Sequence, residues 1–231
     1  MVRITMTRIL TFIFTCCFVF CPADLRGEDG LSASPLFQYI KDIVQSSGPP
    51  DGSEGSAWDV FMAYPSIAEF QRDILLGLQS KNDDIRNEIF YMLNVIDFRR
   101  GGYDSIMKRF LSTQSVTRQL RLFNEQSPLM LMHMIDKFEI RSLRDIVFMN
   151  TAHEDPRVRQ GAYMVLGHSV GNYDKRKARY YLRRGLKDKD ICLVYFGSVS
   201  EQAAEACVRL GGGFRLLLWF HAPEYRYKLF E

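Results

Sequence analysis

Apolar residues recur at every third or fourth position through most of the chain beyond Trp58. This spacing gives a helix one continuous apolar side, whereas a half-buried strand would need strict alternation. The pattern is clearest in three runs: Ile67, Phe70, Ile74, Leu75 and Leu78; Ile85, Ile89, Met92, Leu93 and Ile96; and Leu143, Ile146 and Val147. The sequence therefore predicts a succession of amphipathic helices and no strand.

Turn-forming residues divide this succession at short intervals. They lie at Gly101-Gly102, Ser127-Pro128, Gly171-Asn172 and Gly211-Gly212-Gly213. Glycine and proline at these points are expected to end one helix and allow the next to begin. The helices between them would be roughly 10 to 16 residues long, which is the length found in helical-repeat proteins.

The stretch from Asp155 to Gly167 is the clearest single unit. Asp155 can cap the helix through its side-chain oxygen, and Pro156 suits the first helical turn. Val158, Ala162 and Leu166 then share one side of the helix. We take six residues as the signature of a repeat: Asp155, Pro156, Val158, Arg159, Ala162 and Leu166.

This stretch resembles the HEAT-repeat consensus, in which an Asp-Pro turn precedes a Val-Arg pair and a Leu-Gly ends the apolar side. The same frame can be laid over three further positions: Asn82, with Ile85, Arg86, Ile89 and Leu93; Asp188, with Ile191, Tyr195 and Val199; and Thr113, with Val116 and Leu120. The resemblance covers residues 67–210. It implies an all-α fold, a short HEAT-like α-solenoid of stacked antiparallel helix pairs that leaves an extended surface for partners.

The first 23 residues have the three zones of a secretory signal peptide. Arg3 and Arg8 precede an apolar run over residues 9–20, and Cys21-Pro22-Ala23 supplies small residues for cleavage after Ala23. The apolar run is shorter than the ~18 residues that span a bilayer as a helix. The sequence predicts export after cleavage, with the periplasm or cell envelope of a bacterium as the location.

A lipid-anchored form is the alternative, because Cys16, Cys17 and Cys21 lie at the end of the apolar run. Bacterial lipoprotein processing usually requires a small residue before the modified cysteine. Thr15, Cys16 and Phe20 occupy those positions, so the fit is poor. The preferred hypothesis is therefore a cleaved, exported chain, and the alternative is a membrane-attached envelope assembly factor.

The chain after the signal peptide divides at residue 57. Residues 24–57 hold one stretch with helical spacing, Pro35 to Gln45. A run rich in Ser, Gly and Pro follows from Ser46 to Ser56 and is typical of a flexible linker. Residues 58–231 form the predicted repeat domain.

Composition and charge narrow the classes of partner. The chain is 47% hydrophobic and 25% charged, which is typical of a globular protein. Removal of Arg3 and Arg8 from the 30 basic residues leaves 28 against 27 acidic ones. A net charge near +1 provides no general attraction for nucleic acid, so any electrostatic binding must come from a local patch.

One such patch lies between Tyr173 and Lys189. Ala178, Tyr181, Leu182 and Leu186 would form the buried side of a helix whose outer side is strongly basic. We take Lys175, Arg176, Arg179, Arg183 and Lys187 as a candidate partner-binding site. A solvated helix surface is the simpler interpretation; the alternatives are an acidic protein, a cell-wall polymer or an anionic membrane surface.

Residue types that carry catalysis or bind metals lack the required spacing. The four histidines, His133, His153, His168 and His221, include no zinc-peptidase pair. His153-Glu154 is one His-Glu dipeptide, where the di-iron HEAT-repeat hydroxylases have several. The three glycines at 211–213 are not followed by the Lys-Ser or Lys-Thr of a phosphate-binding loop. We predict no metal, no cofactor and no enzyme activity, with an unrecognised enzyme as the second alternative.

Cys192 and Cys207 are the two thiols that remain after cleavage, and they form a candidate disulfide in an oxidising compartment. Ser198 and Glu201 are spaced as a capping box, and Gly197 can end a preceding helix. The two cysteines would then face each other across a helical hairpin. Two packed thiols are the alternative.

The segment from Phe214 to the C-terminus is more apolar than the end of a repeat array usually is. It contains Leu216, Leu217, Leu218, Trp219, Phe220, Tyr225, Tyr227, Leu229 and Phe230. Either it folds back over the core, or it is a contact surface for another protein or a second copy. Taken together, these patterns predict an exported, non-catalytic scaffold that binds a protein partner.

Overall fold

The computed structural model describes residues 34–45, 53–192 and 197–230, and this part of the chain is mostly helical, as predicted. The predicted signal peptide lies outside the described residues. The first half contains α2 (Pro35–Gln45), α3 (Ser53–Met62), α4 (Ile67–Leu78), α5 (Asp83–Val95), the 3₁₀ helix η1 (Phe98–Gly101), α6 (Asp104–Leu111), α7 (Gln114–Leu120), α8 (Phe123–Gln126) and α9 (Pro128–Phe138).

The second half begins with a 3₁₀ turn and contains one segment of π-helix. Its elements are η2 (Arg141–Leu143), α10 (Arg144–Asn150), α11 (Pro156–Val165), the π-helical η3 (Leu166–Val170), α12 (Gly171–Tyr173), α13 (Lys175–Gly185), β1 (Ile191–Cys192), β2 (Gly197–Ser198), α14 (Val199–Leu210), α15 (Gly213–His221) and the 3₁₀ helix η4 (Pro223–Leu229).

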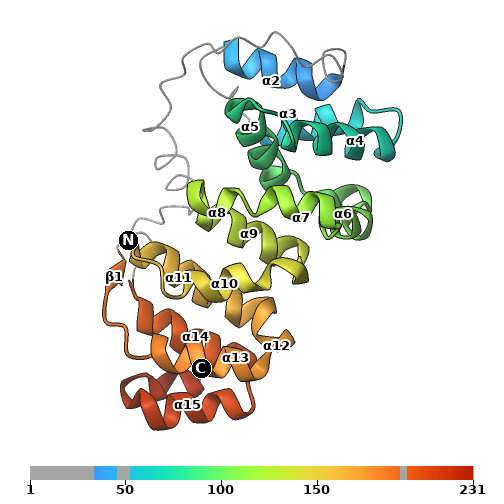
Figure 1. Ribbon diagram of the computed structural model, residues 1–231. Helices are drawn as coiled ribbons and strands as arrows, with labels where there is room; N and C mark the ends of the chain where they lie inside the picture. Colours follow the sequence, from blue (N-terminus) through green and yellow to red (C-terminus); the bar gives the residue numbers. More distant parts are fainter. Residues whose placement is uncertain (1–33, 46–52, 193–196, 231) are drawn as a thin grey trace, which may run out of the picture.

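The helices follow one another in chain order from one end of the molecule to the other (Figure 1). One row consists of α5, α9, α11 and α14, each packed against the next. A second set lies beside this row: α4 contacts α5 and α7, α10 contacts α9 and α11, and α13 contacts α14 and α15. Each helix thus hides its apolar side against neighbours that are close in sequence.

A single cluster of buried apolar side chains runs through the stack, from Leu36 in α2 to Ala222 after α15. At the N-terminal end, aromatic rings dominate it. The Phe61 ring lies 4.9 Å from that of Phe70, 5.3 Å from that of Phe98 and 5.0 Å from that of Tyr103, all close to perpendicular. Edge-to-face packing of this kind joins α3, α4, η1 and α6.

Side-chain caps, of which Asp155 and Ser198 were predicted, explain where several helices begin. Asn82 accepts hydrogen bonds from the backbone of Asp84 and Ile85 at the start of α5. The Asp155 side chain accepts from the backbone N–H of Arg157 at the start of α11, and Ser198 accepts from that of Glu201 at the start of α14. These bonds satisfy N–H groups that have no partner within the helix.

Two predicted boundaries are wrong in position. The linker was expected to extend to Ser56, but α3 already begins at Ser53, so the predicted boundary between residues 57 and 58 lies inside a helix. Likewise, Gly171-Asn172 does not end a helix, because α11 continues through η3 into α12 and the break comes at Asp174. Gly171 is buried against Leu166 and Leu210, so close packing accounts for it better than a turn.

The repeat frame at Asp188 is also wrong. Its first apolar position, Ile191, is 70% exposed and forms β1, which pairs antiparallel with β2. Tyr195 lies outside the described residues. The expectation of no strand therefore fails at this one hairpin, where alternate residues point to opposite sides and a helical frame cannot apply.

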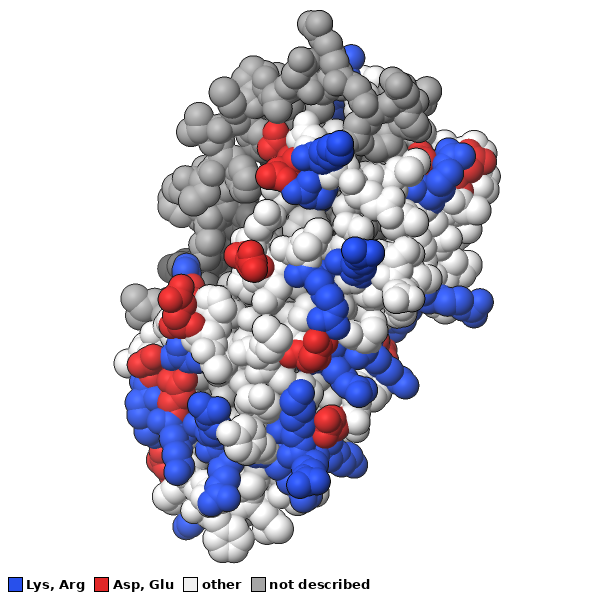
Figure 2. All heavy atoms as spheres, in the orientation of Figure 1, with Lys and Arg blue, Asp and Glu red and all other residues white. Residues whose placement is uncertain are grey.

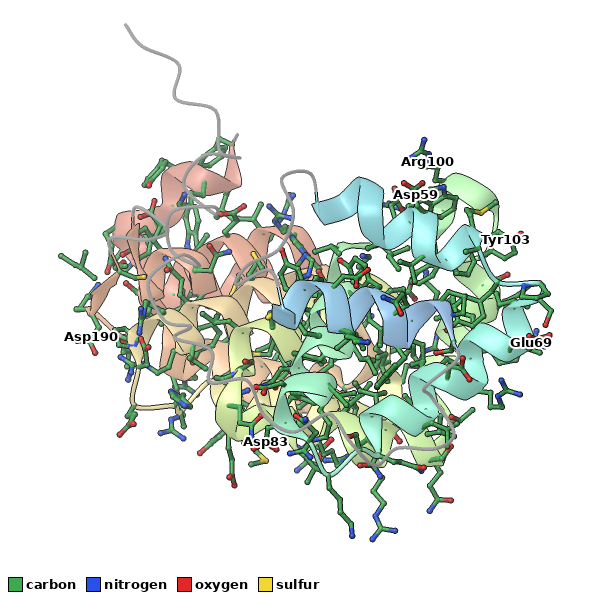
Figure 3. All side chains as sticks on the ribbon, turned by 90° about the horizontal axis from the view of Figure 1, so that it is seen from above. Asp59, Glu69, Asp83, Arg100, Tyr103 and Asp190 are labelled. Atoms are coloured by element: carbon green, nitrogen blue, oxygen red, sulfur yellow. The ribbon has the colours of Figure 1, made fainter. Side chains whose placement is uncertain are left out.

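Seen along the stack, side chains crowd the space between helices, while Glu69, Asp83 and Asp190 lie at the rim (Figure 3). Within the described residues, every helix is too short or too polar to cross a membrane.

Candidate binding surface

Helix α13 is fixed in the stack by its apolar side. Ala178, Leu182 and Leu186 are each at most 1% exposed. Gly185 lies directly against the ring of Tyr163 in α11, where a Cβ atom would come within 2.4 Å of Tyr163 Cζ. The Asp174 side chain accepts a hydrogen bond of 3.1 Å from the backbone N–H of Lys177 and caps the helix. These contacts leave the opposite side of α13 to solvent.

The exposed surface of α13 and of the turn after it carries the five residues predicted from the sequence. We call it the basic face, and it consists of Lys175, Arg176, Arg179, Arg183 and Lys187, all exposed. None of the five forms an ion pair with a carboxylate of the described residues. Figure 2 shows Lys and Arg side chains gathered over the half of the molecule that contains α13.

The spacing of the basic face has an energetic consequence. Arg176, Arg179 and Arg183 are separated by three and four residues, so their guanidinium groups are neighbours on the helix surface. Like charges at this spacing destabilise a helix by about 0.2–0.5 kcal/mol per pair. An anionic partner would offset this repulsion, because its charges attract the guanidinium groups. Salt would weaken that attraction.

Aromatic rings hold one cation of the basic face and one beside it, which the sequence alone did not suggest. The Lys177 ammonium lies 4.6 Å from the centre of the Phe148 ring, and the Arg179 guanidinium lies 5.3 Å from that of Phe214. Cation–π contacts orient a charge without neutralising it. The region around the basic face therefore keeps its positive potential.

A small cavity of about 260 Å³ opens on the other flank of α13. Arg159, Tyr163, Tyr181, Arg184, Asp188 and residues 151–153 line it. Burial raises the pKa of Tyr163 to about 12, so its hydroxyl remains protonated, and it donates to the Tyr181 carbonyl at 3.3 Å. The polar groups of this cavity are largely engaged with one another.

Arg159 forms most of the hydrogen bonds among the groups that line this cavity. Its guanidinium is 11% exposed and donates to Asp188 at 2.7 Å, to the carbonyls of His153 and Glu154 at 2.8 Å each, and to Asp190. The bond to Asp188 raises the pKa of Arg159 further. A buried charge needs such a set of partners. Arg159 thus fastens the turn before α11 to the segment after α13.

The remaining signature residues behave as predicted. Asp155 caps α11, and Pro156 occupies its first turn. Val158 is 3% exposed, and Ala162 and Leu166 are fully buried. Their interpretation as packing residues is therefore confirmed, and they contribute no exposed group to a binding site.

Cys192 and Cys207 are both buried, and both are free thiols in the structure. The helical hairpin expected to bring them face to face is replaced by β1, β2 and α14. Burial raises the pKa of the Cys207 thiol to about 12, so the thiolate needed for disulfide exchange is scarce at neutral pH. The alternative of two packed thiols describes the structure.

The sequence did not predict one polar cluster, because its members lie in three different elements. His168 Nδ1 lies 2.8 Å from an Asp136 oxygen, and His168 Nε2 meets the guanidinium of Arg209, which also donates to Glu205 at 2.6 Å. The His168 ring thus bridges α9 and α14. The π-helical segment η3 presents His168 at this point. Only the Glu205–Arg209 spacing was visible in the sequence.

The apolar C-terminal segment has one buried and one exposed side. In α15, Phe214 and Leu218 are buried, whereas Leu216, Trp219 and Phe220 are exposed by 58%, 43% and 71%. Half of the segment therefore folds back over the core, and half remains uncovered by any described residue.

Among the described residues, no group of three or more His, Cys, Asp or Glu side chains is placed to hold a metal ion. Comparison with protein-family models, with curated proteins and with solved structures gives no match for the chain. The surface geometry therefore has to support any functional proposal by itself.

Proposed function

We propose that this protein is an exported, non-catalytic scaffold of HEAT-like repeats that binds the acidic segment of a partner protein through the basic face of α13. One observation supports this above all others. Four exposed cations on α13 and Lys187 in the turn after it lie close together in sequence, and none forms an ion pair with a carboxylate of the described residues. An exposed single-sign surface on a firmly packed helix is suited to electrostatic docking.

The packing of the stack is consistent with this role. Layers that contact only near neighbours expose a long surface relative to their volume, as helical-repeat scaffolds do. The signature residues of α11 serve packing and capping. Export is inferred from the charged, apolar and small-residue zones of residues 1–23.

A charge-matched pair of variants tests partner binding. The triple variant Arg176→Gln/Arg179→Gln/Arg183→Gln removes three charges from the basic face. Arg109→Gln/Arg118→Gln/Arg144→Gln removes three from exposed arginines elsewhere. Proteins of an envelope extract that are retained by the parent chain and by the second variant, but lost with the first, would be identified by mass spectrometry. We expect their binding segments to be acidic and their retention to fall with salt.

If both triple variants retain the same proteins to the same extent, the basic face is not the docking site. Export is tested separately by fractionation and N-terminal sequencing of the mature chain, which we expect to begin at Asp24. Recovery in the membrane fraction with the N-terminus intact, or with lipid on Cys21, would instead favour the membrane-attached alternative.

A further inference from the structure

Exposed large apolar side chains concentrate at the C-terminal end of the stack. Of the twelve among the described residues, five lie between Leu216 and Phe230, and each of the other seven lies on a different element or turn. The five are Leu216, Trp219, Phe220, Tyr227 and Phe230. Single exposed apolar residues are ordinary, whereas a contiguous group indicates an interaction surface.

The geometry of α15 places three of them on one side. Phe214 and Leu218 are buried, and α15 packs against α13, α14 and η4. At 100° per residue, Leu216, Trp219 and Phe220 fall opposite these buried positions. We call these three residues the apolar end surface. Because α15 is the last α-helix, this surface lies at the end of the stack, where Figure 1 shows α15.

Trp219 is held firmly in this surface. The Arg226 guanidinium donates to the Trp219 carbonyl, with Nε at 3.0 Å and Nη2 at 2.7 Å, and lies 4.6 Å from the centre of the indole ring. The backbone and ring are thus fixed from the η4 side. A preorganised aromatic residue loses little conformational entropy on binding.

The charges around the apolar end surface are mainly positive. Residues 213–230 contain Arg215 and Arg226, together with Lys228, which is paired with Glu201 at 3.3 Å, and Glu224, which is paired with Lys189 at 2.5 Å. Arg215 is exposed beside Leu216, and the basic face lies on the adjacent helix α13. In Figure 2, blue side chains lie above the mainly white lower end of the molecule.

We propose that the apolar end surface docks onto an anionic lipid bilayer, with Trp219, Phe220 and Leu216 inserted at the headgroup level. Trp and Phe beside Arg on one side of a helix are typical of interfacial membrane contacts. Arg215 meets lipid phosphates, and because the other side of α15 is held by the core, the helix lies along the membrane plane.

A second copy of this chain fits the surface less well. Two copies meeting through α15 would bring Arg215 and the basic face of each close to those of the other. An anionic membrane supplies the complementary charge instead. This inference goes beyond the proposed partner binding and does not depend on it.

The chain has two tryptophans, Trp58 and Trp219, so fluorescence can report on this site alone. In the full chain carrying Trp58→Phe, Trp219 is the sole emitter. With vesicles of phosphatidylcholine and phosphatidylglycerol, we expect its emission to shift to shorter wavelength and to be quenched by brominated lipid chains. In the matched variant Trp219→Phe, the emission of Trp58 should not change.

Vesicle sedimentation supplies the second measurement. The variant Trp219→Ala/Phe220→Ala should bind anionic vesicles at least about tenfold more weakly than the parent chain. The control Leu122→Ala/Met149→Ala, at side chains that are 60% and 61% exposed, should bind as the parent does. The variant Arg215→Gln should lose about fivefold on anionic vesicles and little on neutral ones.

The proposal is overturned if brominated lipid does not quench the emission of Trp219. This holds even if the chain binds to the vesicles, because other residues would then make the contact. It is equally overturned if the Trp219 emission shifts with protein concentration in the absence of lipid, because a second copy then covers the surface.

Discussion

At the scale of single residues, Glu88 in α5 stands out. Burial and the nearby charge of Asp84 raise the pKa of this carboxyl from 4.5 to about 7. Burial, with a smaller contribution from the charge of Glu88, raises the pKa of Tyr39 in α2 to about 12. Helix α2 packs against α5, the helix that carries this carboxyl, which is about half ionised at neutral pH.

Replacement of Glu88 by Gln should stabilise the protein at pH 8 and leave its stability nearly unchanged at pH 4. Because the folded-state pKa lies above the unfolded value, the favourable contribution of the protonated carboxyl is complete below about pH 4.5 and is lost as the pH rises through 7. A gain of about 2 kcal/mol at pH 8 is expected in the free energy of unfolding, measured by urea titration.

Glu125 supplies the control for this experiment, since its side chain is exposed. The variant Glu125→Gln should change stability little at either pH. If Glu88→Gln and Glu125→Gln behave alike across the pH range, the Glu88 carboxyl is not held in its protonated form by burial.

At the scale of elements, close helix packing depends on particular glycines. Gly167 in η3 lies so near α14 that an added Cβ would come within 2.8 Å of the Ala206 Cα. At Gly161 in α11, an added Cβ would instead meet the end of the Leu129 side chain at 2.7 Å. A backbone cannot yield to a new methyl group as the tip of a side chain can.

The substitution Gly167→Ala should therefore destabilise the protein by about 2 kcal/mol, because η3 and α14 must move apart. Gly161→Ala should cost clearly less, since Leu129 can rotate away and alanine favours the helix. Thermal unfolding followed by circular dichroism compares the two. Equal losses would mean that the contact between η3 and α14 is not rigid.

At the scale of the whole molecule, the stack is built from local contacts. Helix α2 packs against α3 and α5 and buries Leu36, Phe37 and Ile40. The long row α5, α9, α11 and α14 does not need α2 to be continuous. In such arrays, each layer is stabilised mainly by its neighbours.

A chain beginning at Ser53 should accordingly keep the helices from α4 onward and lose about 3 kcal/mol of stability, from the exposure of the side chains beneath α2. A chain beginning at Ser34 retains α2 and should match the parent chain after signal removal. Helix content per residue and the urea midpoint test this. A collapse of helix content in the shorter chain would show that the layers fold as one indivisible unit.

The sequence alone was sufficient for much of the local structure. Three- and four-residue spacing predicted the helices, and Asp155 and Ser198 were recognisable as caps because capping depends on a few adjacent residues. The exposure of the basic face was predictable for the same reason, since helical geometry places the charges from Lys175 to Arg183, and Lys187 follows in the turn after α13.

Tertiary structure decided the rest, because contacts between distant residues leave no periodic trace in the sequence. The sequence predicted a break at Gly171, but the helix continues there and Gly171 packs against Leu210. It also predicted a helix at Ile191, where β1 forms. The bridge from Asp136 through His168 to Arg209 joins residues that no local pattern connects. The sequence marked the C-terminal segment as apolar, but only the packing of α15 decided that Leu218 is buried and Phe220 exposed.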